Sequence, residues 1–126
     1  MNVFDNEGEA GASFILSTIT SSQGVVNASV GVIGGTAITA MAELLQPKRG
    51  AFQGLIAKAA LITVETGTVT MTLDGSTPTV AAGTNLGHQF AAGQSYVIKG
   101  ENNIRNCRFI NTVAANGTVV KGTLFY

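Results

Sequence analysis

The sequence predicts a mainly β protein, a small antiparallel β-sandwich or barrel with one short helix. Three observations support this fold class. The chain has 126 residues, which suits one domain, because two separate cores would each be too small to be well stabilised by burial. From about Ala60 onward, short runs rich in β-branched residues follow one another. Glycine, proline, aspartate and asparagine separate these runs at regular intervals, as turns do in a sandwich.

The first two strands of this region are expected at Leu61–Val64 and Val69–Leu73, where apolar residues alternate with threonine. Thr66-Gly67 between them can bend or bulge the chain. Asp74-Gly75, followed by Pro78, predicts a reversal, because Asp-Gly favours a tight turn and proline cannot donate to a strand ladder.

Three more strands are expected, at Gln94–Lys99, Ile104–Val113 and Thr118–Phe125. The more apolar face of the middle one consists of Cys107, Phe109 and Asn111. Asn116-Gly117 favours a tight primed turn, so the last two strands are expected to form a closing hairpin. The C-terminal half is therefore predicted to be a strand meander.

The N-terminal half has no dominant period, apart from one segment. Apolar residues at helical spacing, ended by Pro47, predict a short helix over 36–46, and a strand through Ala37–Ala42 is the competing interpretation. We therefore divide the chain into an N-terminal arm or extension over residues 1–55, which contains this helix, and a β-sandwich over residues 56–126. The two parts are expected to form one compact unit.

Composition and charge narrow the range of partners. Seven basic and seven acidic residues balance, so no net field would attract nucleic acid or an anionic membrane. Charged residues make up only 11% of the chain, against roughly 25% in typical soluble domains. A surface so poor in charge is commonly covered by a partner, so a homo-oligomer or a component of an assembly is expected. A single cysteine and an acidic start without a secretory pattern fit synthesis in a reducing cytoplasm.

The residues that carry chemistry are few, and we expect no enzyme, metal site or cofactor. One cysteine and one histidine cannot supply the ligands of a zinc site. The acidic start resembles part of a calcium loop but lacks the glutamate that closes one. His88 is the only imidazole that could activate a nucleophile, and its polar surroundings are typical of a surface histidine. Cys107 is expected to be a small buried side chain.

Three segments resemble a group of small virion proteins of tailed bacteriophages, over about the last 70 residues. They are Ala60–Thr66, Thr72–Thr79 and Gly100–Asn106, the last continuing to Phe109-Ile110. In that group a strand leads into an Asp-Gly-x-x-Pro turn, an Asn-Ile-x-Asn strand follows, and a hairpin with an aromatic end closes the domain. Residues 1–55 carry little of the resemblance.

The resemblance implies a β-sandwich accessory protein of the virion, made in the host cytoplasm. The first expectation is a capsid decoration or cement protein that bridges capsomers, with itself and the major capsid protein as partners. A trimer would suit local three-fold positions, although the sequence does not fix the stoichiometry. The alternatives are a neck or tail component (head-tail connector or collar) and a carbohydrate-binding, adhesin-like module.

Four residues are candidates for subunit contacts, because aromatic and arginine side chains near chain ends often anchor interfaces. They are Phe4, Arg105, Arg108 and Tyr126.

Overall fold

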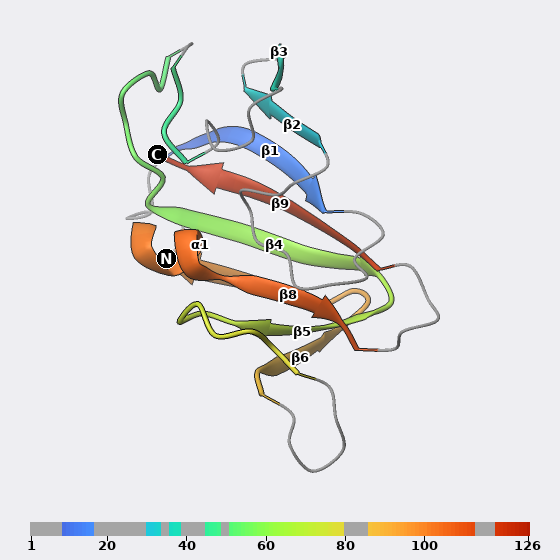
Figure 1. The fold of residues 1–126 in the computed structure, drawn as a ribbon. Coiled ribbons are helices and arrows are strands. Elements are labelled where there is room, and N and C mark those ends of the chain that lie inside the picture. Colours follow the sequence, from blue (N-terminus) through green and yellow to red (C-terminus); the bar gives the residue numbers. More distant parts are fainter. Residues whose placement is uncertain are drawn as a thin grey trace, which may run out of the picture.

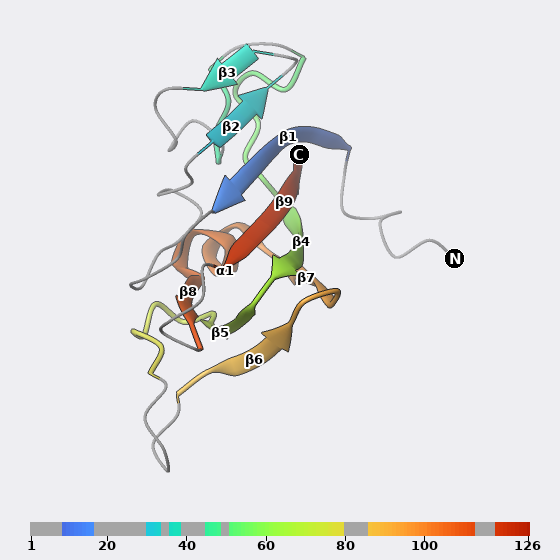
Figure 2. The same ribbon diagram turned by 90° about the vertical axis from the view of Figure 1, so that its right-hand side faces the viewer.

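The structure is a computed structural model of the chain, and it describes residues 9–16, 30–33, 36–38, 45–48, 51–79, 86–112 and 118–126. These residues form two antiparallel sheets and one short helix, so the predicted fold class is confirmed. The arrangement is a small sandwich, with the larger sheet above the smaller one in Figure 1 and turned by 90° in Figure 2.

The larger sheet has six strands in the order β3-β2-β1-β9-β4-β7. Their bounds are β1 Ala10–Leu16, β2 Val30–Ile33, β3 Thr36–Ile38, β4 Ala59–Thr66, β7 Ser95–Lys99 and β9 Val119–Phe125. The smaller sheet has the order β6-β5-β8, with β5 Thr68–Thr72, β6 His88–Ala91 and β8 Arg108–Asn111. The helix α1, Glu101–Asn106, lies at the end of the sandwich where β4 begins (Figure 1).

The strand β1 lies inside the larger sheet, between β2 and β9. Alternation along it buries Phe14 and Leu16, as expected for a strand with one face on the core. Residues 10–16, within the stretch predicted as an arm or extension, therefore form part of the larger sheet. No clear period marks this strand in the sequence, because glycine and small residues dilute the alternation.

The chain passes from one sheet to the other at Gly67, between β4 and β5. Gly67 has φ 77°, a conformation that favours glycine, and a Cβ there would lie 2.5 Å from the Thr118 hydroxyl. Thr118 in turn donates a 2.7 Å hydrogen bond to the buried Asn111 side chain. The bend expected at Thr66-Gly67 is therefore present, and it separates strands of different sheets.

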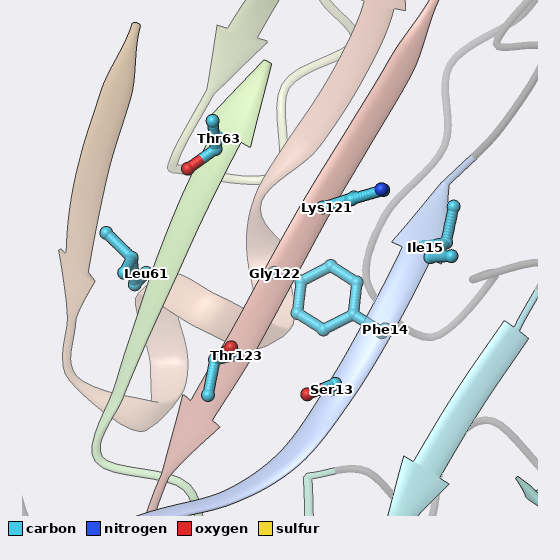
Figure 3. A pocket seen from close by; sticks show the side chains of 8 residues that line it. All are labelled: Ser13, Phe14, Ile15, Leu61, Thr63, Lys121, Gly122 and Thr123. Carbon is cyan, nitrogen blue, oxygen red and sulfur yellow. The ribbon is translucent and has the colours of Figure 1, made fainter. Parts of the chain in front are cut away.

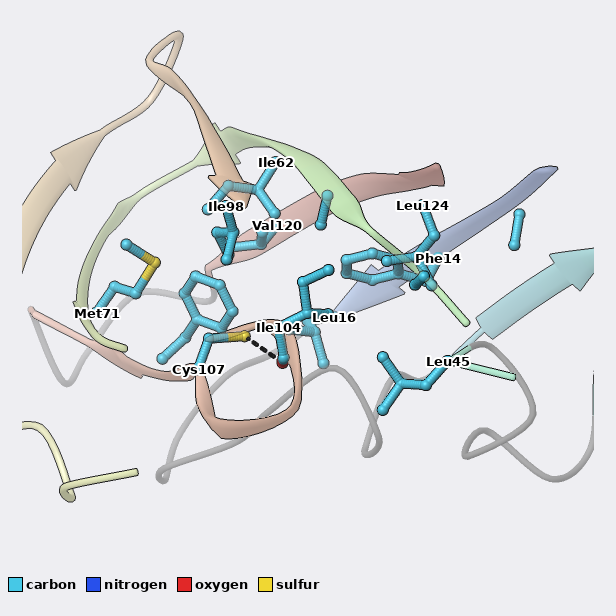
Figure 4. Packing of buried hydrophobic residues seen from close by; sticks show 14 of the residues in the cluster. Phe14, Leu16, Leu45, Ile62, Met71, Ile98, Ile104, Cys107, Val120 and Leu124 are labelled. Atoms are coloured by element: carbon cyan, nitrogen blue, oxygen red, sulfur yellow. Dashed lines mark hydrogen bonds between the residues drawn. The ribbon is translucent and has the colours of Figure 1, made fainter. Parts of the chain in front are cut away.

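The core lies between the sheets and takes side chains from both, together with Ile104 of α1 (Figure 4). At its centre the Phe14 ring packs flat against Gly122 of β9, where any side chain would overlap the ring. The predicted apolar face of Cys107, Phe109 and Asn111 is confirmed, since all three are buried. The Cys107 thiol donates to the Ile104 carbonyl at 3.1 Å (Figure 4).

Three predictions of secondary structure need correction. The strand expected at Ile104–Val113 begins only at Arg108, because Glu101–Asn106 form α1, where Glu101 and Arg105 pair one helical turn apart. The closing hairpin and the meander are wrong, since β8 pairs with β5 while β9 pairs with β1 and β4. Asn116-Gly117 lies outside the described residues.

The helix predicted over 36–46 does not begin where expected. Thr36–Ile38 form the edge strand β3, which pairs with β2, as the competing strand interpretation allowed for Ala37 and Ile38. Leu45 and Gln46 lie in a turn, and residues 39–44 lie outside the described residues. Among the residues that the structure describes, the helix is α1, which lies outside the predicted helical segment.

Candidate interaction surface

The loop over residues 51–58 leads into β4 and is fixed by backbone hydrogen bonds along its length. Gly54 N–H donates to the Pro47 carbonyl at 3.0 Å, and Ala57 N–H to the Leu45 carbonyl at 2.9 Å. Lys58 N–H then donates to the Phe125 carbonyl at 2.7 Å, which joins the loop to the end of β9. The backbone of this loop is therefore held by residues 45–47 and, at its end, by β9.

Two large aliphatic side chains project from this ordered loop. Leu55 is 48% exposed and Ile56 43% exposed, although their neighbour Ala57 is fully buried. They line a groove of about 490 Å³, which we call the Leu55 groove and define by its lining residues, Gly54, Leu55, Ile56, Ala57, Lys58, Gly100 and Glu101. Adjacent exposed aliphatic residues on a fixed backbone are a feature of surfaces that bind a partner.

The polar rim of the Leu55 groove is formed at the start of α1. Glu101 lines the groove and accepts two hydrogen bonds from the Arg105 guanidinium, at 3.0 and 2.6 Å. Lys58 lines the groove from the loop. Protein-protein interfaces commonly have an apolar centre surrounded by polar and charged groups, as Glu101, Lys58 and Arg105 are placed here.

Arg105, a contact residue predicted from the sequence, pairs with the groove-lining Glu101, whereas Leu55 and Ile56 were not predicted. The signal for them was weak: two adjacent aliphatic residues after Gly54, in a segment without the alternation of a strand. Their exposure depends on the turn at Gly54, whose φ is 81°, and on the bonds to Pro47 and Phe125. Those contacts are tertiary and cannot be read from local pattern.

The three predicted contact residues that the structure describes do not gather at one place. Arg105 lies beside the Leu55 groove, whereas Arg108 is half-buried on β8, opposite Thr72 in the smaller sheet. Tyr126 is only 4% exposed and packs 5.3 Å from the Phe52 ring, so its side chain belongs to the core of this chain. Burial raises the pKa of the Tyr126 phenol. Phe4 lies outside the described residues.

The outward face of the larger sheet carries a second, more polar hollow of about 320 Å³ (Figure 3). Ser13, Thr63, Thr123 and Lys121 surround it, with the aliphatic Ile15 and Leu61. Lys121 forms a 2.7 Å ion pair with Glu65, and both side chains are about half exposed. Such exposed pairs contribute little to stability.

A third hollow, of about 520 Å³, lies where β6 and β7 meet. Its lining includes His88, Gln89, Phe90 and Tyr96, and the rings of Phe90 and Tyr96 lie 5.5 Å apart. His88 is exposed on β6, as predicted for a surface histidine. Tyr96 is 37% exposed, which makes it the most accessible described aromatic side chain of this region.

Asp74 has a structural place in the turn that follows β5. Asp74 accepts a 3.0 Å hydrogen bond from Ser76 N–H, which confirms its predicted place in a turn, and this bond lowers the pKa of its carboxyl. Among the residues that the structure describes, no three histidine, cysteine or carboxylate side chains are close enough to hold a metal ion. Within the same ranges, no helix has the length and apolar character needed to span a membrane.

Comparison with known proteins gives no relative: no protein-family model matches the chain, and no curated protein or solved structure is significantly similar to it. Function must therefore be inferred from the surface of this molecule and from its sequence.

Proposed function

We propose that this chain is an accessory structural protein of a tailed-bacteriophage virion, specifically a capsid decoration or cement protein. It acts by binding, as a homo-oligomer, to the major capsid protein and bridging neighbouring capsomers. The resemblance of three segments to small virion proteins supports the proposal, and so does a neutral surface poor in charge.

The observation that carries the proposal is the Leu55 groove. A free monomer gains nothing from holding Leu55 and Ile56 in water on a loop fixed by hydrogen bonds to Pro47 and Phe125. Burial of each side chain by a partner would contribute roughly 1.5–3 kcal/mol. The groove is therefore a suitable anchor for contact with a capsid.

Symmetry would turn this modest contact into a strong effect on the particle. A shell presents the same site many times, and a protein that holds two capsomers at once binds the second at high effective concentration. Each bridge then opposes separation of the capsomers. No catalytic group is needed for this mechanism.

The test compares the binding of the purified protein and two variants to assembled phage heads that lack it. Leu55→Ser removes the exposed aliphatic group of the groove. Leu86→Ser removes an equally exposed leucine, 49% accessible, next to β6 and serves as the matched control. We expect the wild type and Leu86→Ser to bind in a saturable number related to the shell symmetry, and Leu55→Ser to bind at least about tenfold more weakly.

Two outcomes would count against a decoration protein. Binding to isolated necks or tails while ignoring heads would favour the neck or tail component. Equal binding of Leu55→Ser and the wild type to heads would show that the groove does not contact the capsid.

A second candidate function, carbohydrate binding, is favoured by one observation. Tyr96, beside Phe90, faces a hollow that also carries His88 and Gln89, and a sugar ring commonly stacks on an aromatic side chain while polar groups bind its hydroxyls. A glycan array separates the two functions: selective binding that is lost in Tyr96→Ala would support the adhesin-like module.

A further inference from the structure

The strand β7 forms one edge of the larger sheet, and it is the longest edge strand in the described parts of the chain. It has five residues, whereas the edge strands β3, β6 and β8 have three, four and four. Natural proteins usually protect an edge with proline, a bulge or inward charge. The pairing of β7 with β4 is regular, and Lys99 at its end is its only charged residue.

The hydrogen bonds of β7 to β4 show which of its backbone groups face outward. Gly100 N–H donates to the Lys58 carbonyl at 2.7 Å, and the Gln94 carbonyl accepts from Val64 N–H at 3.0 Å. Antiparallel bonding alternates along a strand, so Tyr96 and Ile98 also bond to β4. The N–H and C=O groups of Ser95 and Val97 therefore point away from the sheet.

At the C-terminal end of β7, a side chain of α1 already bonds to the edge. The Asn103 side chain of α1 donates a 2.8 Å hydrogen bond to the Lys99 carbonyl. The accessible stretch is thus Ser95–Val97, with Tyr96 at its centre.

One self-complementary register uses every outward backbone group of this stretch. If two copies of β7 align antiparallel with Tyr96 opposite Tyr96, then Ser95 of each copy lies opposite Val97 of the other. Each Ser95–Val97 pair exchanges both backbone bonds, so four hydrogen bonds form and all four outward N–H groups and carbonyls are used. The overlapping residues carry no charge, so no like charges meet.

The side chain of Tyr96 gives an independent reason for the same register. It is 37% exposed and packs on one side against Phe90, 5.5 Å away. At a two-fold axis the two tyrosines would lie directly opposite each other at a non-hydrogen-bonded position, where the Cα atoms are about 4.5 Å apart and aromatic pairs are favourable. Dimerisation would therefore cover one of the largest exposed apolar side chains of the described surface.

We propose that the protein forms a two-fold symmetric dimer through β7, with Tyr96 on the axis and the two six-stranded sheets joined into one. The partner is a second copy of this chain, because the edge complements itself in this register and two-fold dimers have isologous interfaces. The dimer does not depend on the proposed virion role, since it is measured on the purified protein alone.

The test introduces a charge of either sign at position 96. Light scattering and sedimentation then measure association from about 1 µM to about 1 mM protein, a range that covers the dissociation constants of weak dimers. Y96K and Y96E each place two like charges opposite each other on the axis, so each variant alone should dimerise roughly a hundredfold more weakly than the wild type. An equimolar mixture of the two should restore a heterodimer, because lysine then faces glutamate. Leu86→Ser, at another exposed leucine, should dimerise as the wild type does.

A second pair of variants tests the backbone bonds. Val97→Pro removes an N–H that points away from β4, whereas Val97→Ala truncates the side chain and keeps that N–H. The proposal expects dimers of Val97→Ala and monomers of Val97→Pro, with circular dichroism showing that both are folded.

Several results would overturn the dimer. These are a monomeric wild type throughout the concentration range, dimers that persist in Y96K, a mixture of Y96K and Y96E that stays monomeric, or open polymers in place of a closed dimer. Polymers would instead indicate head-to-tail pairing of β7 with another edge strand.

Discussion

The strands β9 and β7 belong to one sheet, and they differ in what surrounds them. The strand β9 is paired on both sides, with β1 and β4, and it carries Gly122 under the Phe14 ring. The strand β7 is paired on one side only, and it leaves Tyr96 partly exposed. The strand β9 has no backbone edge left for a partner, whereas β7 keeps unpaired backbone groups and an exposed apolar side chain.

The same contrast separates the core from the Leu55 groove. Phe14 and Leu124 are buried because two sheets enclose them, but Leu55 and Ile56 are held outside by a loop whose own backbone is well bonded. Substitutions in the core should therefore change stability, and substitutions in the groove or at the edge should change association.

The contact of Phe14 with Gly122 should be the most sensitive point of the fold. Phe14→Ala should lower the free energy of unfolding by about 3–5 kcal/mol, because it leaves a cavity in the core. Gly122→Ala should cost about 1–3 kcal/mol, since the new Cβ overlaps the ring. Urea unfolding of both single variants and the double variant measures this. The double variant should lose less free energy of unfolding than the two single variants lose together. Strictly additive losses would show that the two residues do not interact.

The turn at Gly67 joins the two sheets, and its substitution should have the next largest effect. Gly67→Ala should destabilise the protein by about 1–3 kcal/mol, because φ is positive and the added Cβ meets the Thr118 hydroxyl. Gly54→Ala is the control, since φ is positive there too but no atom lies within 4 Å of the new Cβ. Equal losses in urea melts would mean that strain alone matters at Gly67.

The buried phenol of Tyr126 should make stability depend on alkaline pH. Its raised pKa means that the fold favours the neutral form, so its contribution is intact below the ordinary tyrosine pKa of about 10 and is lost as pH rises above that value. The free energy of unfolding should fall more steeply in the wild type than in Tyr126→Phe over this alkaline range. If the free energies of unfolding of the two proteins fell in parallel with pH, the buried phenol would not be the cause.

The Leu55 groove should show the opposite behaviour from the core. Leu55→Ser and Ile56→Ser should each change the free energy of unfolding by no more than about 0.5 kcal/mol, as expected for exposed positions. Thermal melts of the two variants measure this. A loss near that of Phe14→Ala would show that these side chains support the fold.

Strands with clear alternation could be predicted from sequence, and elements that depend on distant contacts could not. Leu61–Val64 and Val69–Leu73 alternate apolar residues with threonine and correspond closely to β4 and β5. The last three residues of α1, Ile104–Asn106, are predicted as the start of the strand Ile104–Val113, because one isoleucine among polar residues gives no helical period. In the folded chain the Glu101–Arg105 ion pair and the burial of Ile104 in the core accompany the helical form.

The candidate surfaces were harder to predict than the fold. Arginine enrichment at interfaces predicts Arg105 as a contact residue, which stays a prediction. Position near the chain end predicts Tyr126, which is buried because β9 ends beside Phe52 and Gly11. Leu55 and Tyr96 became candidates only when their exposure was known, and exposure is a property of the folded chain.

The most direct test of the Leu55 groove as the binding surface is the binding of Leu55→Ser to assembled phage heads, measured by light scattering beside its thermal melt. We expect an unchanged melting temperature and at least about tenfold weaker binding, with Leu86→Ser behaving as the wild type in both. Wild-type binding by Leu55→Ser, or loss of binding that accompanies a lowered melting temperature, would contradict the separation of the binding surface from the core.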